Sequence, residues 1–432
     1  MNPTPPDHGW QDHAALMADR TVRPESRWHG PLATTPRHRF VPRWWAGDDH
    51  DGEWVYRLHD GPGDPGAWMN TAYDPSLSVV TRVGPHHADH AAPGATVAET
   101  WPTSSATLPK LVVQMYREAF TVVQMYREAF IADDSRLLVT CGSGYGTALA
   151  CARLGDRQVT SIDIDGHLVE AARERLAQAG HRPEMEVCDL TGALPGDYDR
   201  IISTVAVPGI PASWLKALTP GGRLVTTLSG TGLVIVADKT PDGGARGQVA
   251  PETAMFMNTR HGDDCPPPHP HTTSLWATAR TAEGDVTTGR YPVMRVTGAW
   301  DVRSTLHLIA PGIEHAMDTA DNGARTAYMI HEDGSWARAR ASGKGELPIV
   351  HQGGPRRLWD LLDKIRTWLV TDGDLPVVRA AVRIAHVERQ QMTNRHPQYP
   401  RRRRHPQGGR RRPRPRPPPG TGPPDRPSVS AA

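Results

Sequence analysis

Glycines and two acidic residues in the middle of the chain have the types and spacing of a nucleoside-binding site. The segment LLVTCGSGYGTALA (137–150) runs from an apolar stretch through glycines into a helical pattern. Glycine lets such a turn adopt positive φ and approach a ligand closely, and the following helix offers free N–H groups. Asp163 lies 21 residues after Gly142, and Asp189 ends a later apolar run. This spacing places Asp163 to accept hydrogen bonds from ribose hydroxyl groups.

These residues need regular elements to position them. Between about 109 and 240, apolar runs of strand length alternate with helical stretches. The expected strands cover 137–141, 158–162, 185–188, 199–204 and 223–228, and the expected helices cover 146–154, 167–180 and 211–222. This alternation predicts an α/β fold with a doubly wound, mostly parallel sheet covered by helices.

The glycine turn alone does not identify the cofactor, because nicotinamide and adenosylmethionine cofactors both bind this arrangement. The later pattern favours adenosylmethionine. Asp163 follows the second strand, Asp189 follows the third and can reach an adenine amino group, and a Pro-Gly-Gly turn at 220–222 precedes a late strand. That order resembles the class I methyltransferases that use S-adenosyl-L-methionine, and the resemblance spans about 109–235. It implies that Gly142, Ser143 and Gly144 hold the cofactor together with the two acids.

Five segments in order resemble the protein-L-isoaspartate O-methyltransferase family. They are PRHRFVPRWW (36–45), TSSATLPKLV (103–112), GSGYGTALACARLG (142–155), VTSIDIDGHLVEAARERL (159–176) and YDRIISTVAVPGIP (198–211). A sixth, HQGGPRRLWD (351–360), is similar to an element of the branch that has an extra C-terminal domain and modifies aspartates in ribosomally made peptides. The resemblance covers most of 30–370. It implies a Rossmann-like class I methyltransferase fold with an N-terminal cover and a smaller C-terminal accessory domain.

The resemblance also implies an activity. Methyl transfer from S-adenosyl-L-methionine to the carboxylate of an isoaspartyl or aspartyl residue gives an ester, which a backbone nitrogen can displace to form a succinimide. The partner is then a protein or peptide substrate, without a membrane and without a specific nucleic acid. Protein repair and peptide maturation share this chemistry, and the sequence leaves both open.

Hydroxyl groups at 103–107 are the candidates for catalytic contacts. In the family, a Ser or Thr two residues before a Pro contacts the substrate carboxyl group; here that residue is Thr107, with Ser104 and Ser105 nearby. A carboxylate with a reference pKa near ~4 is already ionised at pH 7 and needs no general base. The alternative role for Thr107 is to cap a helix that begins near Pro109.

Three residues depart from the family pattern. Leu138 stands where a Glu is usual, and Thr140 and Leu190 stand where Gly is usual. A Thr in a positive-φ turn would be strained by roughly 1–3 kcal/mol, unless the loop slides by two residues onto the next Gly-x-Gly-x-Gly. The alternative hypothesis is therefore a non-catalytic pseudo-methyltransferase, a binding protein with a degenerate glycine loop.

Composition divides the chain of 432 residues into regions. Residues 391–432 hold eleven arginines and one acid, a charge of +10, so the net charge of +2 leaves −8 for the rest. Its run RRRRHPQGGRRRPRPRP (401–417) can attract anions, but without interleaved aromatic residues it lacks a specific nucleic-acid contact. The expected organisation is a loop-rich, substrate-covering region at 1–100, a cofactor-binding domain at 101–240, a linker at 241–271, an accessory domain at 272–385 and a disordered Pro/Arg-rich tail at 386–432.

One repeat interrupts the pattern, because VVQMYREAF occurs at 112–120 and again at 122–130. A shift of ten residues rotates a helix face by about 80°, so the copies do not present the same face. We expect one copy to be dispensable for folding and ligand binding.

The sequence predicts no metal site. Its four cysteines (141, 151, 188 and 265) show no CxxC spacing, and the histidines of GPHHADH (84–90) are expected in a solvated loop. No apolar run approaches the ~18–20 residues of a membrane-spanning helix, and the N-terminus lacks a signal-peptide pattern. A reducing cytoplasm is the expected location.

Overall fold

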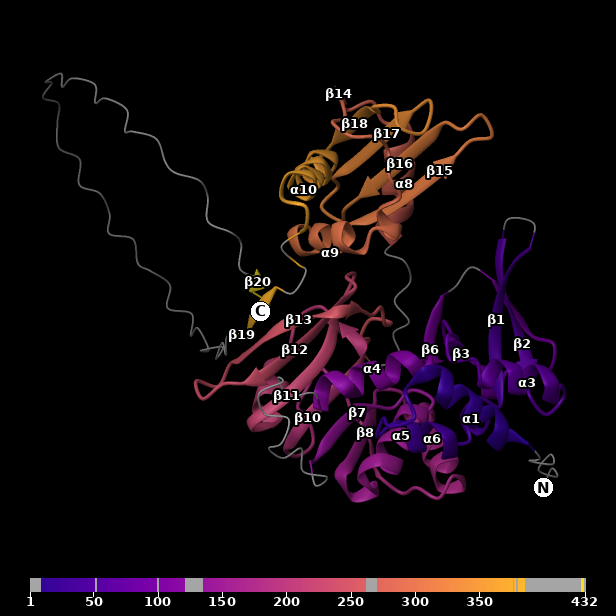
Figure 1. Ribbon diagram of the computed structural model, residues 1–432. Coiled ribbons are helices and arrows are strands. Elements are labelled where there is room, and N and C mark those ends of the chain that lie inside the picture. The colour runs from indigo at the N-terminus through magenta and orange to yellow at the C-terminus, as the bar shows by residue number, and fades with distance from the viewer. Residues whose placement is uncertain are drawn as a thin grey trace, which may run out of the picture.

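The computed structural model of the chain describes residues 9–50, 53–98, 101–120, 135–261, 270–375, 377, 380–384 and 429–430. These residues form three β-sheets with their helices (Figure 1). The second copy of the repeat, at 122–130, and almost all of the predicted tail lie outside the described residues. The first copy lies in helix α4 (Pro109–Phe120).

The N-terminal region is built on a six-stranded antiparallel sheet in which β4, β3, β1, β2 and β5 lie in that order and β6 pairs with β3. Its strands are β1 (Arg43–His50), β2 (Glu53–Asp60), β3 (Val79–Val83), β4 (His86–His87), β5 (Thr96–Ala98) and β6 (Pro102–Ala106). Its helices are α1 (Trp10–Thr21), α2 (His29–Thr34), η1 (Arg37–Phe40), α3 (Pro65–Ala72) and η2 (Ala88–His90). The prediction of a loop-rich region is wrong, because β1 and β2 pair in continuous register from Arg43↔Asp60 to His50↔Glu53.

The central sheet has nine strands in the order β20-β19-β13-β12-β11-β10-β7-β8-β9. They are β7 (Leu137–Thr140), β8 (Val159–Asp163), β9 (Glu184–Val187), β10 (Tyr198–Val207), β11 (Leu218–Leu228), β12 (Leu233–Lys239), β13 (Ala245–Thr253), β19 (Ala381–Ile384) and β20 (Val429–Ser430). The five strands from β9 to β11 are parallel. Strands β8 and β9 are added on one side of β7, and β10 and β11 are then added on the other side of β7. This reversal of strand order creates a topological switch point between β7 and β10.

The prediction of a mostly parallel sheet is correct for these five strands and wrong for the strands beyond them. Strand β12 pairs antiparallel with β11, β13 with β12, and β19 with β13. Short connections such as the turn between β11 and β12 permit only antiparallel pairing, whereas parallel strands need a crossover. Strand β13 also lies inside the predicted linker 241–271, so the first half of that segment belongs to the sheet.

Helices cover both faces of the central sheet, as alternation along β7 shows. Leu138 belongs to one apolar cluster, and its neighbours Leu137 and Val139 belong to another. The second cluster contains residues of α4, α5 (Tyr145–Leu154) and α6 (Gly166–Gln178), and the first contains residues of α7 (Ala212–Ala217). Because Leu138 fills the core, an apolar residue there serves packing.

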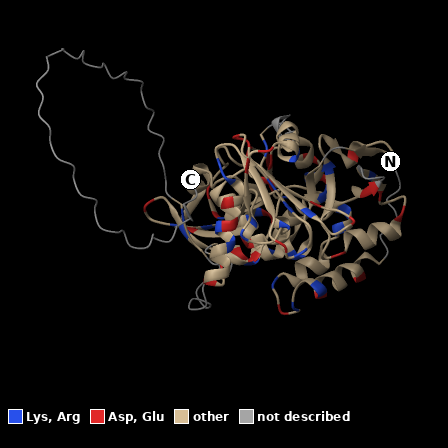
Figure 2. Ribbon diagram, turned by 90° about the horizontal axis from the view of Figure 1, so that it is seen from above, with Lys and Arg blue, Asp and Glu red and all other residues tan. Residues whose placement is uncertain are grey.

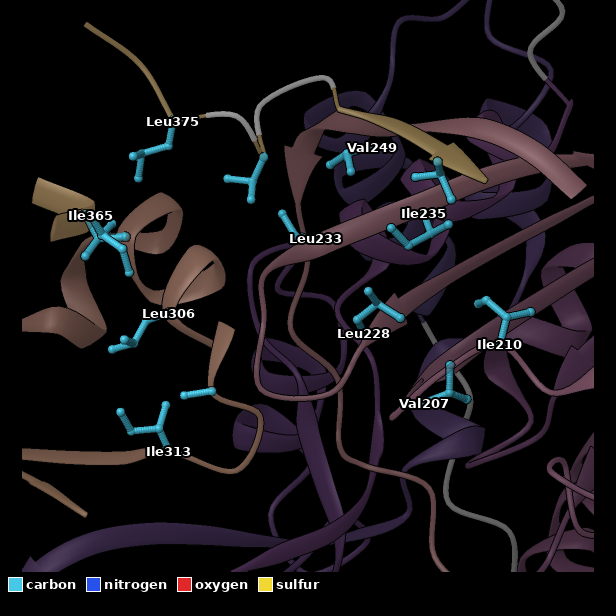
Figure 3. Packing of buried hydrophobic residues seen from close by; sticks show 14 of the residues in the cluster. Val207, Ile210, Leu228, Leu233, Ile235, Val249, Leu306, Ile313, Ile365 and Leu375 are labelled. Carbon is cyan, nitrogen blue, oxygen red and sulfur yellow. The ribbon is translucent and has the colours of Figure 1, made fainter. Parts of the chain in front are cut away.

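The third region holds a five-stranded antiparallel sheet in the order β14-β18-β17-β16-β15. Its strands are β14 (Asp285–Thr288), β15 (Glu314–Thr319), β16 (Arg325–Ile330), β17 (Trp336–Ala341) and β18 (Ile349–Gly353). Its helices are α8 (Pro270–Thr281), η5 (Val296–Gly298), α9 (Trp300–Ile309) and α10 (Leu358–Asp372). Leu306 of α9 and Ile365 of α10 belong to the same buried cluster as Leu228 and Ile235 of the central sheet (Figure 3).

The predicted end of the accessory domain at 385 is wrong. Residues 381–384 form β19, which pairs with β13 of the central sheet from Gln248↔Ala381 to Ala245↔Ile384. The backbone N–H and C=O groups at the edge of β13 thereby find partners. The third region is thus an insertion between two neighbouring strands of the central sheet.

Basic and acidic residues are interspersed over the described ribbon (Figure 2). Among the described residues, no helix is long and apolar enough to span a membrane.

Candidate functional site

A cavity of about 350 Å³ lies at the carboxyl edge of the parallel strands, beside the switch point. The ends of β7, β8, β9 and β10 line it, together with β6 of the N-terminal sheet and residues 255–260. Open α/β sheets bind ligands at this edge, because helix N-termini and free loop backbone gather there.

The glycine turn lies on the floor of this cavity. Gly142 has φ 53° and Gly144 has φ 89°, so both occupy the left-handed region that favours glycine. A Cβ on Gly142 would lie 3.4 Å from the carbonyl oxygen of Ser105, and one on Gly144 would lie 2.9 Å from Cβ of Ala172 in α6. Gly142 therefore lines the cavity, whereas Gly144 lets α5 and α6 approach each other.

Thr140 is an ordinary strand residue, so the predicted strain at this position is wrong. It ends β7, and its Oγ1 lies 2.8 Å from Oγ1 of Thr204 and accepts a hydrogen bond of 2.9 Å from the Thr204 N–H. The positive-φ residues, Gly142 and Gly144, begin two positions later, as expected if the loop uses the next Gly-x-Gly-x-Gly spacing. Thr140 thus links the ends of β7 and β10 beneath the cavity.

Asp163 ends β8 and contacts the glycine turn directly. Its Oδ2 accepts a 3.0 Å hydrogen bond from the Gly142 N–H, and its Oδ1 accepts one of 3.1 Å from the Asp165 N–H. Burial raises the pKa of Asp163, although these two N–H groups and Arg260 oppose the rise. The carboxylate is held rigidly, and each oxygen keeps a second lone pair for a ligand.

Asp189 follows β9 and lies on the cavity wall. Its Oδ1 accepts hydrogen bonds from the Thr191 N–H at 2.8 Å and the Thr191 hydroxyl at 2.7 Å, and its Oδ2 lies 3.0 Å from Nδ1 of His261. Partial burial opposes ionisation, but the hydrogen bonds from His261 and Thr191 outweigh it and lower the pKa of Asp189.

The predicted hydroxyl groups line the opposite wall. Ser104, Ser105 and Thr107 all face the cavity, and Ser104 Oγ accepts a 3.0 Å hydrogen bond from Thr81. Directly before α4, the Leu108 N–H donates a 3.1 Å hydrogen bond to Ser78 Oγ, and the cap role of Thr107 stays a prediction.

The structure brings six of the eight predicted residues into one cavity. They are Ser104, Ser105, Thr107, Gly142, Asp163 and Asp189. Ser143 and Gly144 lie outside its lining; Ser143 is buried and borders a separate void of about 30 Å³ next to the glycine turn.

Sequence reasoning missed the segment 254–261, which we call the strap. It crosses the carboxyl edge of the sheet, where the Ala206 N–H donates to the Met257 carbonyl and the Thr259 N–H donates to the Ala206 carbonyl, both at 2.8 Å. Its last residues contact the acids that follow β8 and β9. The strap and the residues that it contacts are far apart along the chain, so the sequence carries no local signal for these contacts.

A second missed residue is Asp165, which caps α6 by accepting hydrogen bonds from the N–H groups of residues 167 and 168. Its other oxygen lies 3.0 Å from Arg260, 3.2 Å from His87 and 3.3 Å from Arg82. Burial opposes ionisation, but these partners hold the pKa of Asp165 well below its usual range. An Asp before a helical pattern is a recognised cap signal, so this role was readable.

The central part of the chain is similar to one family of known proteins. Residues 113–258 match the model of the family described as protein-L-isoaspartate(D-aspartate) O-methyltransferase. A protein-L-isoaspartate O-methyltransferase of Aeropyrum pernix is 37% identical over 116 residues, 25% of this chain and 44% of that protein. One of Methylibium petroleiphilum is 30% identical over 145 residues, 29% of this chain and 49% of that protein. The chain thus spans less than half the length of these two relatives.

A solved protein-L-isoaspartate O-methyltransferase is similar in structure, with a TM-score of 0.42 and 14% identity over 84% of this chain and 93% of that one.

Proposed function

Because residues 113–258 match the model of the protein-L-isoaspartate O-methyltransferase family, we propose that this chain is an S-adenosyl-L-methionine-dependent carboxyl O-methyltransferase. Its substrates are isoaspartyl or aspartyl residues of proteins or peptides. The observation that carries the proposal is the single cavity in which Gly142, Asp163 and Asp189 lie opposite Ser105 and Thr107. Its volume of about 350 Å³ lies within the range of roughly 300–1,000 Å³ for small-molecule sites.

The residues on the sheet side fit the cofactor. Gly142 leaves room for close backbone approach, and the free lone pairs of Asp163 suit two ribose hydroxyl groups. We assign Asp189 to the adenine amino group, beside or in place of His261. When bound, S-adenosyl-L-methionine supplies an electrophilic methyl group on a sulfonium.

The residues of the opposite wall have to hold the substrate carboxylate. We expect the hydroxyl groups of Ser105 and Thr107 to donate hydrogen bonds to it, and Ser104, buried and bonded to Thr81, to support them. Apolar neighbours such as Val80 and Leu111 exclude water from the same wall. Orientation and desolvation are sufficient here, because an ionised carboxylate needs no proton removed.

The N-terminal sheet supports the predicted role of a substrate cover. Its strand β6 supplies Ser104 and Ser105, and Ser78 and Val80 add to the same wall. A covering sheet and an inserted third region both favour an extended peptide substrate of the branch with an accessory domain. Repair of isoaspartate and maturation of a peptide aspartate are the two forms of this proposal.

Transfer of labelled methyl groups to two peptides that differ only in Asp or isoAsp tests the proposal. Label on isoAsp indicates repair, label on Asp alone indicates maturation, and no label on either refutes the methyltransferase. Thr107→Val removes a hydroxyl bond to a charged group, about 1.5–3 kcal/mol, and should lower kcat/KM about 10- to 100-fold. Thr34→Val, which changes an exposed hydroxyl in α2, is the matched control and should leave kcat/KM unchanged.

One observation favours the non-catalytic alternative, namely that His261 binds the carboxylate assigned to adenine. Calorimetry with S-adenosyl-L-methionine separates the two hypotheses. Heat of binding that is lost in Asp163→Asn supports the enzyme, and the absence of heat at millimolar cofactor supports a binding protein of another kind.

A further inference from the structure

Three metal-ligating side chains meet outside the cavity. Cys151 lies in the last turn of α5, Asp156 begins the short helix η4 (Asp156–Gln158), and His181 follows α6. Their donor atoms, Sγ, a carboxylate oxygen and a ring nitrogen, all lie within 4.8 Å of one another. His181 Nδ1 is already 2.9 Å from Asp156 Oδ1.

The cluster lies at the edge of the sheet opposite the cavity. Helix α5 leads through η4 into the amino end of β8, and α6 leads into the amino end of β9. Gly155 and Gly180, both with φ 89°, turn the chain directly after each helix, so the two connections converge. A ligand here would join two crossovers of the sheet without touching the cavity.

The local electrostatics favour a cation. Both helices end at the cluster, and the C-terminal end of a helix carries partial negative charge from its free carbonyl groups. The Asp156 carboxylate is fixed by the Arg182 N–H at 2.6 Å.

A group of three histidines elsewhere in the structure lacks free negative charge that could favour a cation. His87, His90 and His167 lie with ring centroids 4.0–5.7 Å apart, but the nearby acids are bound to arginines. Asp89 pairs with Arg175, and Asp165 pairs with Arg82 and Arg260. The negative charge near those imidazoles is therefore already neutralised.

We propose that Cys151, Asp156 and His181 form a structural site for a divalent cation of the zinc class. Sulfur, nitrogen and oxygen donors are the ligands of zinc, and tetrahedral ligands at its usual bond lengths lie about 3.3–3.6 Å apart. The part-exposed side chains of Asp156 and His181 can close the remaining gap. On binding, the Cys151 proton leaves to solvent, the thiolate, carboxylate and neutral imidazole become ligands, and water takes the fourth position. This proposed site goes beyond the sequence analysis, which predicts no metal site.

Cobalt titration of the full chain, freed of metal with a chelator, tests the site. A thiolate ligand gives a sulfur-to-cobalt charge-transfer band in the near ultraviolet, and we expect that band at one equivalent. Cys151→Ser should abolish it, and Cys188→Ser, a part-exposed thiol outside the cluster, should preserve it. A band that persists in Cys151→Ser, or no band in the unmodified chain, overturns the proposal.

Thermal unfolding with zinc gives a second measurement, whose signal is the Tm and not an absorption band of the thiolate. Zinc at about 100 times its Kd should raise the folding equilibrium constant about 100-fold and shift the Tm upward. His181→Asn and Asp156→Asn, whose side chains are only part-buried, should remove that shift, and His167→Asn should retain it. An equal zinc shift in His181→Asn and the unmodified chain contradicts the site.

Discussion

Replacing Thr140 with glycine, the residue usual in the family, should destabilise the protein and should not improve cofactor binding. The substitution removes two hydrogen bonds to Thr204 and leaves the Thr204 N–H without its partner. A part-buried donor left unpaired costs about 1–2 kcal/mol, and glycine in a strand costs about 0.5–1 kcal/mol more. The free energy of unfolding should therefore fall by about 1.5–3 kcal/mol.

Urea unfolding of Thr140→Gly and Thr140→Val measures the two contributions separately. Valine keeps the branched shape and the strand preference but removes the hydroxyl, so it should cost only about 1–2 kcal/mol. Calorimetry with S-adenosyl-L-methionine should show no gain in affinity for either variant. If Thr140→Gly were as stable as the unmodified chain and bound cofactor about tenfold more tightly, Thr140 would be a degenerate glycine, and our account of the loop would be wrong.

Three further changes test the site and the fold. Asp163→Asn should weaken binding of S-adenosyl-L-methionine about 10- to 100-fold in calorimetry, because charge-assisted bonds are lost; an unchanged Kd would remove Asp163 from the site. His261→Ala should tighten the same binding by less than about tenfold, because it frees an oxygen of Asp189 from a largely exposed partner, and weaker binding would contradict this. Burial lowers the pKa of His38 to about 4, so below about pH 6.5 the unfolded chain takes up a proton that the fold excludes. His38 should therefore contribute a fall in unfolding free energy of up to about 1.4 kcal/mol per pH unit between about pH 6.5 and 4, and His38→Gln should reduce the slope by that amount; equal slopes would refute it.

The parallel half of the fold could be predicted because its signals are local. Each βα unit places an apolar run, a turn and a helical pattern next to one another, as in 137–154. Helix α4 likewise begins at Pro109, where the sequence predicts it. Strand β19 was missed because its partner, β13, is more than 100 residues away along the chain.

The site residues likewise fall into those that local spacing predicts and those that come from distant parts of the chain. Gly142 follows β7 and Asp163 ends the next strand, β8, so their spacing along the chain is enough to predict that they meet. The wall that carries Ser105 and the strap that carries Arg260 come from other parts of the chain. The resemblance to a family predicted the wall that carries Ser105, whereas no spacing of residues in the sequence predicted the strap.

The strap joins the cavity to the third region through the covalent chain. It follows β13 directly, contacts Asp165 and Asp189 at the cavity, and precedes α8. After α10 the chain returns to pair with β13 as β19, so both ends of the insertion lead to that strand (Figure 1). The shared apolar cluster of α9, α10 and the central sheet fixes the insertion on that sheet. The third region is therefore held at β13 and at the shared cluster, whereas the strap is held at the cavity by its own hydrogen bonds to Ala206 and to the two acids.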